Sequence, residues 1–97
     1  MTNEEIWNIG LEERTDELSK LQSAYDRLDV ECRKAEFEKD MYARLRDVNN
    51  AMLYKQKFSE KYEKCSRASE KLTKQKNALE NEISVLKKEI YYINSLM

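Results

Sequence analysis

The sequence lacks proline and histidine altogether and contains a single glycine in 97 residues. Proline and glycine supply most tight turns, so this chain has few places at which to reverse direction. Histidine is the side chain that most often transfers protons near neutral pH, and it is also the commonest metal ligand. The sequence therefore argues against an enzyme, and it predicts no catalytic, metal or cofactor site.

Cysteine is scarce, and neither sign of charge is in excess. The two cysteines, Cys32 and Cys65, match no metal-binding or redox spacing, which favours a reducing compartment. Eighteen Lys and Arg against nineteen Asp and Glu give a net charge of -1, so the whole chain has no excess that attracts polyanions. No apolar run approaches the ~18 residues of a membrane span. We expect a cytoplasmic or cytoskeleton-associated protein, with the nucleus as the alternative compartment.

What the sequence does contain is a stripe of apolar residues at alternating steps of three and four. A first heptad frame has Leu11, Leu18, Tyr25 and Cys32 at a, and Arg14, Leu21, Leu28 and Ala35 at d. A second frame has Met41, Val48, Lys55, Tyr62, Ser69, Lys76, Ile83, Ile90 and Met97 at a, and Arg44, Ala51, Phe58, Cys65, Leu72, Leu79, Leu86 and Ile93 at d. Most of these positions are apolar and the remaining faces are polar, which is typical of a coiled-coil seam.

The pattern predicts an all-α chain, with one long, nearly continuous helix that forms a two-stranded coiled coil. The two frames are out of step by two residues, so we expect a heptad discontinuity near residues 28–45. Thr2 and Glu5 fit a capping box at the start of a short N-terminal segment, residues 1–10, which we expect to be a cap or a frayed turn. Residues 11–97 are predicted to be the rod, and the expectation is that it belongs to a longer one.

The C-terminal heptads favour a parallel pair of chains. Ile83 and Ile90 at a, with Leu79 and Leu86 at d, form the combination that suits a parallel dimer. The alternative is antiparallel pairing, either between chains or by a hairpin near Asn49 and Asn50, because residues 1–48 have a net charge of -5 and residues 49–97 one of +4. A turn at those asparagines would interrupt a run of helix formers that contains no Gly or Pro, which argues against it.

Two sets of residues are candidates for binding protein. The predicted dimerisation residues are Leu18, Leu21, Leu28, Leu72, Leu79, Ile83, Leu86, Ile90 and Ile93. The middle stretch 41–62 contains more apolar residues than a two-stranded seam can cover. We expect the remaining apolar residues, Tyr42 among them, to lie on the flanks of the seam, where they predict an exposed surface for a partner protein. Its predicted residues are Leu45, Met52, Leu53 and Tyr54.

The segment Lys55–Lys76 holds eight bases and three acids, which gives a nucleic-acid or acidic-surface binder as an alternative function. Its bases are spaced around the helix, so a solvated face is the favoured interpretation and nucleic acid a disfavoured partner.

The heptad pattern over residues 11–97 resembles that of long coiled-coil rods in cytoskeletal, spindle-pole, kinetochore, motor-tail and vesicle-tethering proteins. The resemblance implies a structural interaction protein: a homodimeric scaffold, spacer or tether that binds other proteins of such systems. It extends to the repeat alone and transfers no catalytic or binding residue.

Overall fold

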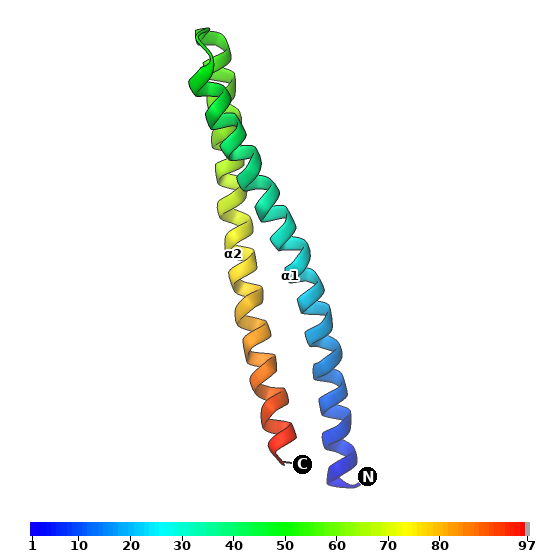
Figure 1. Ribbon diagram of the computed structural model, residues 1–97. Helices are drawn as coiled ribbons and strands as arrows, with labels where there is room; N and C mark the ends of the chain where they lie inside the picture. Colours follow the sequence, from blue (N-terminus) through cyan, green and yellow to red (C-terminus); the bar gives the residue numbers. More distant parts are fainter. Residues whose placement is uncertain (97) are drawn as a thin grey trace. The chain divides into compact units, whose positions relative to one another are not determined.

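The computed structural model describes residues 1–96, and within that range it consists of two α-helices and no strand (Figure 1). Helix α1 spans Asn3–Val48 and helix α2 spans Met52–Leu96. The all-α prediction is confirmed. Met97, the last a position of the second predicted frame, lies outside the described residues.

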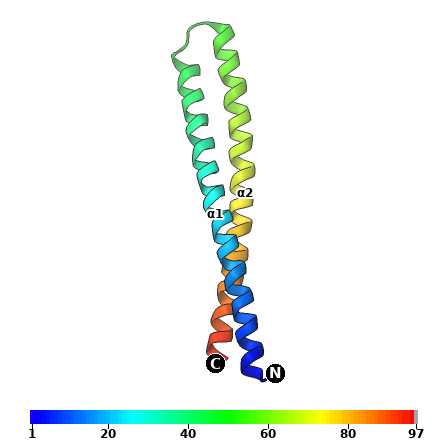
Figure 2. The same cartoon turned by 90° about the vertical axis from the view of Figure 1, so that its right-hand side faces the viewer.

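The prediction of one nearly continuous helix is wrong, because α1 ends at Val48 and a new helix begins at Met52. Figure 2 shows the chain reversing direction between the two helices. The side-chain Oδ1 of Asn49 accepts a hydrogen bond from the backbone N–H of Ala51 at 3.0 Å, a local bond that competes with continued helix. No described residue has a positive φ, so this turn needs neither glycine nor proline.

The chain divides into two compact units, which we call the turn unit and the terminal unit. The turn unit is Leu28–Lys76, and the terminal unit combines Met1–Arg27 with residues 77–96. Because α1 and α2 each contribute one segment to each unit, every unit contains two helical segments.

In the turn unit the two segments form an antiparallel helical hairpin. Lys76 Nζ donates a hydrogen bond to Asp29 Oδ1 at 2.6 Å, and Cys65 Sγ donates one to Glu38 Oε2 at 3.9 Å. These two pairs set a register in which Ala35 lies level with Ser69. Ala35 and Ser69 are both buried, so small side chains occupy the place where the two helices face each other.

In the terminal unit the two segments also run antiparallel. Arg14 pairs with Glu89, while a hollow further along α1 is lined by Tyr25 from one segment and by Glu80 and Ile83 from the other. Leu86 is the buried apolar residue of this unit. The N-terminus of α1 has the cap that the sequence predicts, since Thr2 Oγ1 accepts a hydrogen bond from the Glu5 backbone N–H at 3.2 Å.

The discontinuity expected near residues 28–45 is absent from the burial pattern there. The first frame continues past Ala35, with Lys39, Tyr42, Arg46 and Asn49 all partly buried at successive a and d positions. Arg44 and Val48, which the second frame assigns to the seam, are exposed. The change of frame therefore falls at the turn, where a new helix starts its own register, and α1 keeps one frame to its end.

Candidate protein-interaction surfaces

The predicted dimerisation residues all lie on the faces that are covered within one chain. Leu86 is buried and the other eight are partly buried. In the terminal unit, Leu21 and Leu86 line one hollow from opposite segments. The stripe that the sequence assigns to a second chain therefore coincides with the contact between helices of the same chain, and a dimer through it remains a prediction.

An ion pair closes the end of the turn unit that lies away from the turn. Asp29 Oδ1 is 2.6 Å from Lys76 Nζ, and its second oxygen is 3.2 Å from Arg33 Nε. The hydrogen bond from Lys76 lowers the pKa of Asp29 below its ordinary value, with a smaller contribution from the nearby Arg33 charge, and desolvation opposes both. Lys76 occupies an a position, so this pair places a base of the seam against an acid of the opposite helix.

Aromatic rings fill the inner face of the hairpin near the turn. Tyr42 and Phe58 stack with their ring centroids 6.3 Å apart. Lys61 lies over the Tyr42 ring at 5.4 Å, while Lys39 and Arg46 lie over Tyr62 at 5.7 and 5.1 Å. Cation–π contacts of this kind contribute ~0.5–1 kcal/mol at exposed sites.

The expected position of Tyr42 on the outer flank is therefore wrong. The signal that would have placed it correctly is the first heptad frame, which puts Tyr42 at d when it is extended past Ala35.

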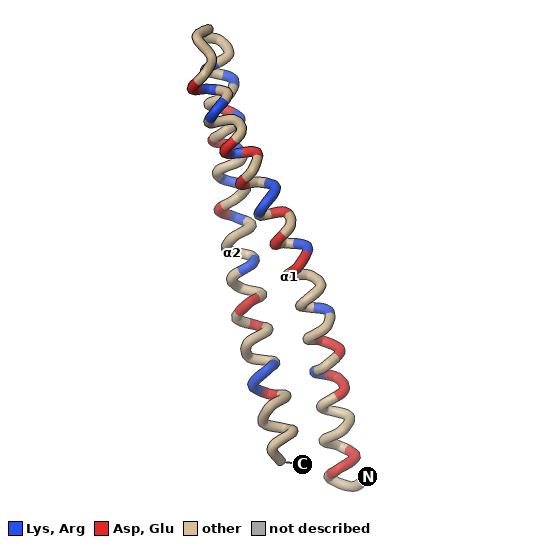
Figure 3. The backbone as a smooth tube through the Cα atoms, in the orientation of Figure 1, with Lys and Arg blue, Asp and Glu red and all other residues tan. Residues whose placement is uncertain are grey.

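The basic segment 55–76 belongs to the turn unit. Some of its bases contact residues of α1, and others lie on the solvent-exposed surface of α2. Lys76 and Lys61 engage Asp29 and Tyr42 respectively, and Lys55 is partly buried. Exposed bases of the segment share the helix surface with Glu60, Glu63 and Glu70, and both signs of charge are visible along this part of α2 (Figure 3). The segment thus supplies intrachain contacts as well as solvated charge.

Large apolar side chains are exposed on both sides of the loop at the tip of the hairpin. Leu45 is 37% exposed, Met52 80%, Leu53 61% and Tyr54 52%. These four residues, which we call the turn surface, flank the loop from both helices, and the side chains from Met52 to Tyr54 form the first turn of α2. Their exposure agrees with the expected surplus of apolar residues in the middle stretch. Exposed patches of Met and aromatic residues are typical of protein-binding sites.

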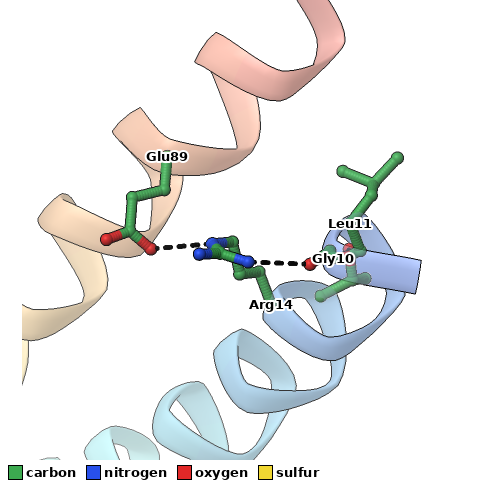
Figure 4. Close-up of polar contacts among 5 residues, drawn as sticks. Gly10, Leu11, Arg14 and Glu89 are labelled. Carbon is green, nitrogen blue, oxygen red and sulfur yellow. Dashed lines mark hydrogen bonds and ion pairs between the residues drawn. The ribbon is translucent and has the colours of Figure 1, made fainter. Parts of the chain in front are cut away.

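In the terminal unit, a polar contact between the two helical segments lies on the surface. Arg14 Nε donates a hydrogen bond to Glu89 Oε2 at 3.0 Å, and Arg14 Nη1 donates one to the Gly10 carbonyl at 3.2 Å (Figure 4). Both charged side chains are more than a third exposed, and solvent-exposed pairs contribute little to stability. The pair helps to align the two segments without marking a binding site.

In the part of the chain that the structure describes, no group of three or more Cys, Asp or Glu side chains is arranged to hold a metal ion. Neither α1 nor α2 has a stretch of the length and hydropathy that a membrane crossing requires, within residues 1–96.

Comparison of the chain with protein-family models, with curated proteins and with solved structures gives no match.

Proposed function

We propose that the chain is a structural interaction protein, a coiled-coil scaffold, spacer or tether that binds another protein through the turn surface. The observation that carries the proposal is the exposure of Leu45, Met52, Leu53 and Tyr54 around one loop. An isolated exposed apolar residue is ordinary, whereas a cluster of them costs solvation free energy that a bound partner recovers.

Coiled-coil packing is part of the same proposal. Its support is the heptad spacing on both arms and the alignment of the Asp29–Lys76 and Glu38–Cys65 pairs across them. The sequence favours a homodimer that uses this stripe between two parallel chains. The hairpin competes with that dimer, because the same side chains can be sheltered by only one neighbour at a time.

The cellular setting of the proposal comes from the resemblance of the heptad pattern to known rods. A partner in a cytoskeletal, spindle, kinetochore, motor or vesicle-tethering system, in the cytoplasm or on the cytoskeleton, is the hypothesis. It requires a helical support and an exposed apolar site, and both features are present in the turn unit.

The test compares the proteins bound to the wild type with those bound to a turn-surface variant. Met52→Glu with Leu53→Glu places two charges in the surface, and Val85→Glu is the control because Val85 is 54% exposed in the terminal unit. Chemical cross-linking in cells that produce the protein, followed by mass spectrometry, identifies the partners. A central apolar anchor typically contributes at least 1–2 kcal/mol to binding, so we expect a partner recovered about tenfold less with the double variant and equally with the control.

Recovery of the same proteins in the same amounts from the double variant would remove the turn surface as the binding site. Circular dichroism of each variant verifies that the helical content is unchanged.

A further inference from the structure

Helix α1 has a second apolar stripe, on the side that faces away from α2 in the turn unit. This outer stripe consists of Val30, Phe37, Met41 and Val48. At about 100° per residue the four positions lie within roughly 40° of one direction, and Cys32 and Ala35 lie on the opposite side. Cys32 and Ala35 are 5% and 8% exposed, whereas Val30, Phe37 and Val48 are 66%, 67% and 75% exposed. A helix with two opposed apolar faces has a place for a second neighbour.

The spacing of the outer stripe is symmetric about residue 39. Its steps are seven, four and seven residues, so the order of positions is the same read from either end. A twofold contact between identical helices requires that, when residue i touches residue j of the other copy, j also touches i. A palindromic antiparallel pairing meets that condition, with Val30 level with Val48 of the second copy and Phe37 level with Met41.

We propose that the outer stripe binds a second copy of this chain, with the two α1 segments antiparallel about a twofold axis near residue 39. The proposal deepens the scaffold function, on which it rests, by assigning self-association to a surface other than the stripe already covered by α2.

A hollow in the surface lies where the second copy would insert a side chain. It has a volume of about 330 Å³ and is lined by Phe37, Asp40, Met41, Arg44 and Leu45. Four of these positions are i, i+3, i+4 and i+7, the set that forms a hole for one knob of a facing helix. The twofold axis places Phe37 of the second copy level with residue 41, above this hole. A cavity of roughly 150 Å³ accommodates benzene, so the hollow is large enough for the phenyl ring.

The charges beside the outer stripe favour an identical partner over a strongly charged one. The flanking bases are Arg33, Lys34 and Arg44, and the flanking acids are Glu31, Glu38, Asp40 and Asp47. These flanks carry a net charge of only -1, so the overall repulsion between two copies is small. The α2 segment 55–76, with eight bases and three acids, is the part of the turn unit where an acidic partner would be attracted instead.

The first experiment measures the solution mass of the full chain by sedimentation over a hundredfold range of concentration. We expect the wild type to reach a two-chain mass, and Phe37→Glu to remain a single chain with unchanged helical content by circular dichroism. Val85→Glu, which adds the same charge at an exposed valine of the terminal unit, should associate like the wild type. A wild type that stays single throughout, or a two-chain mass retained by Phe37→Glu, overturns the proposal.

The second experiment tests the orientation and does not depend on how Phe37→Glu folds. Val30→Cys and Val48→Cys are made separately in a Cys32→Ala, Cys65→Ala background, because Val30 and Val48 should lie level across the twofold axis. Oxidation of the two variants mixed should give a disulfide between positions 30 and 48, and either variant alone should give several-fold less dimer. Dominant 30–30 and 48–48 dimers would show parallel pairing and overturn the proposal.

The two proposals fail separately. Partner recovery in cells that depends on Met52 and Leu53 but not on Phe37 supports the turn surface whatever the mass measurement gives. Conversely, a dimer that Phe37→Glu abolishes and the Met52→Glu, Leu53→Glu variant retains supports the outer stripe even if no partner is recovered.

Discussion

At the residue scale, the contact between the two helices of the turn unit depends on small side chains and a single well-placed ion pair. Ala35 and Ser69 face each other at the centre of the hairpin and are both buried, which lets the two backbones approach closely. Lys76 interrupts the apolar stripe at an a position, and Asp29 compensates its charge from the opposite helix at 2.6 Å. The base that looks unfavourable in a seam of identical parallel chains is therefore matched by an acid in the antiparallel hairpin.

The Asp29–Lys76 pair predicts a pH dependence of stability. The pKa of Asp29 is lowered in the folded chain, below the value of about 4 of an unfolded aspartate. The stabilisation is therefore fully present above pH 4 and is lost as the pH falls through the lower folded pKa. We expect Asp29→Asn to reduce the melting temperature at pH 7 and to have no effect at a pH below that folded value.

Thermal unfolding of the wild type and Asp29→Asn, followed by circular dichroism from pH 7 to pH 2, measures this difference. Glu70→Gln is the control, because Glu70 lies exposed in the same unit. A melting-temperature difference between wild type and Asp29→Asn that persists undiminished at the lowest pH would contradict the assigned role of the pair.

At the element scale, both helices and their covered faces follow from the sequence, and the turn between them does not. The a and d positions from Leu11 to Ala35 and from Lys55 to Ile93 are the partly buried and buried faces of α1 and α2, because a three-and-four spacing fixes one side of a helix. Spacing alone does not say whether the neighbour that covers this side is another chain or the same chain. That choice depends on the loop.

The sequence predicts a reversal at Asn49 and Asn50 only as the disfavoured alternative, because the turn signal there is weak. Neither Gly nor Pro is present at this position, but an Asx turn at Asn49 with negative φ throughout is sufficient for the reversal. The turn surface was predicted from the surplus of apolar residues. The outer stripe was not, because Val30 and Phe37 belong to neither heptad frame, and only the hairpin shows that they lie on a second face.

The Asn49 side chain should contribute measurably to the hairpin. Asn49→Ala removes the hydrogen bond from its Oδ1 to the Ala51 N–H, and the loss of one such bond costs about 1 kcal/mol. We expect the free energy of unfolding, measured by urea titration at fixed protein concentration, to fall by about that amount. Asn50→Ala is the matched control, since Asn50 is exposed and its replacement should change the free energy by less than about 0.5 kcal/mol. Equal effects of the two substitutions would show that the Asx turn does not stabilise the reversal.

At the scale of the whole molecule, the question is how many chains share the heptad stripe. Association is part of folding for a stripe that only a second chain can cover, and stability then depends on protein concentration. In each unit of this chain the stripe faces the other helical segment of the same chain and is partly buried or buried there. Self-association through the outer stripe then joins units that are already folded, which separates assembly from folding.

The two cysteines distinguish these arrangements. In a parallel, in-register dimer Cys32 and Cys65 would each face its own counterpart, and oxidation would link the chains. In the hairpin Cys65 lies beside Glu38, and the register places Cys32 level with Leu72, about 10 Å along the helix from Cys65. That separation exceeds the ~7 Å between Cα atoms that a disulfide can span.

We therefore expect mild oxidation of dilute wild-type protein to leave single chains on a non-reducing gel, with neither an interchain nor an intrachain disulfide. A thiol reagent should modify Cys65 faster than Cys32, because Cys32 is 5% exposed and Cys65 is only partly buried. The mixed Val30→Cys and Val48→Cys variants provide the positive control for oxidation if the outer stripe pairs as proposed. Rapid formation of Cys65–Cys65 dimers from dilute wild type would mean that two parallel chains share the stripe. The dimer would then be more stable in solution than the hairpin.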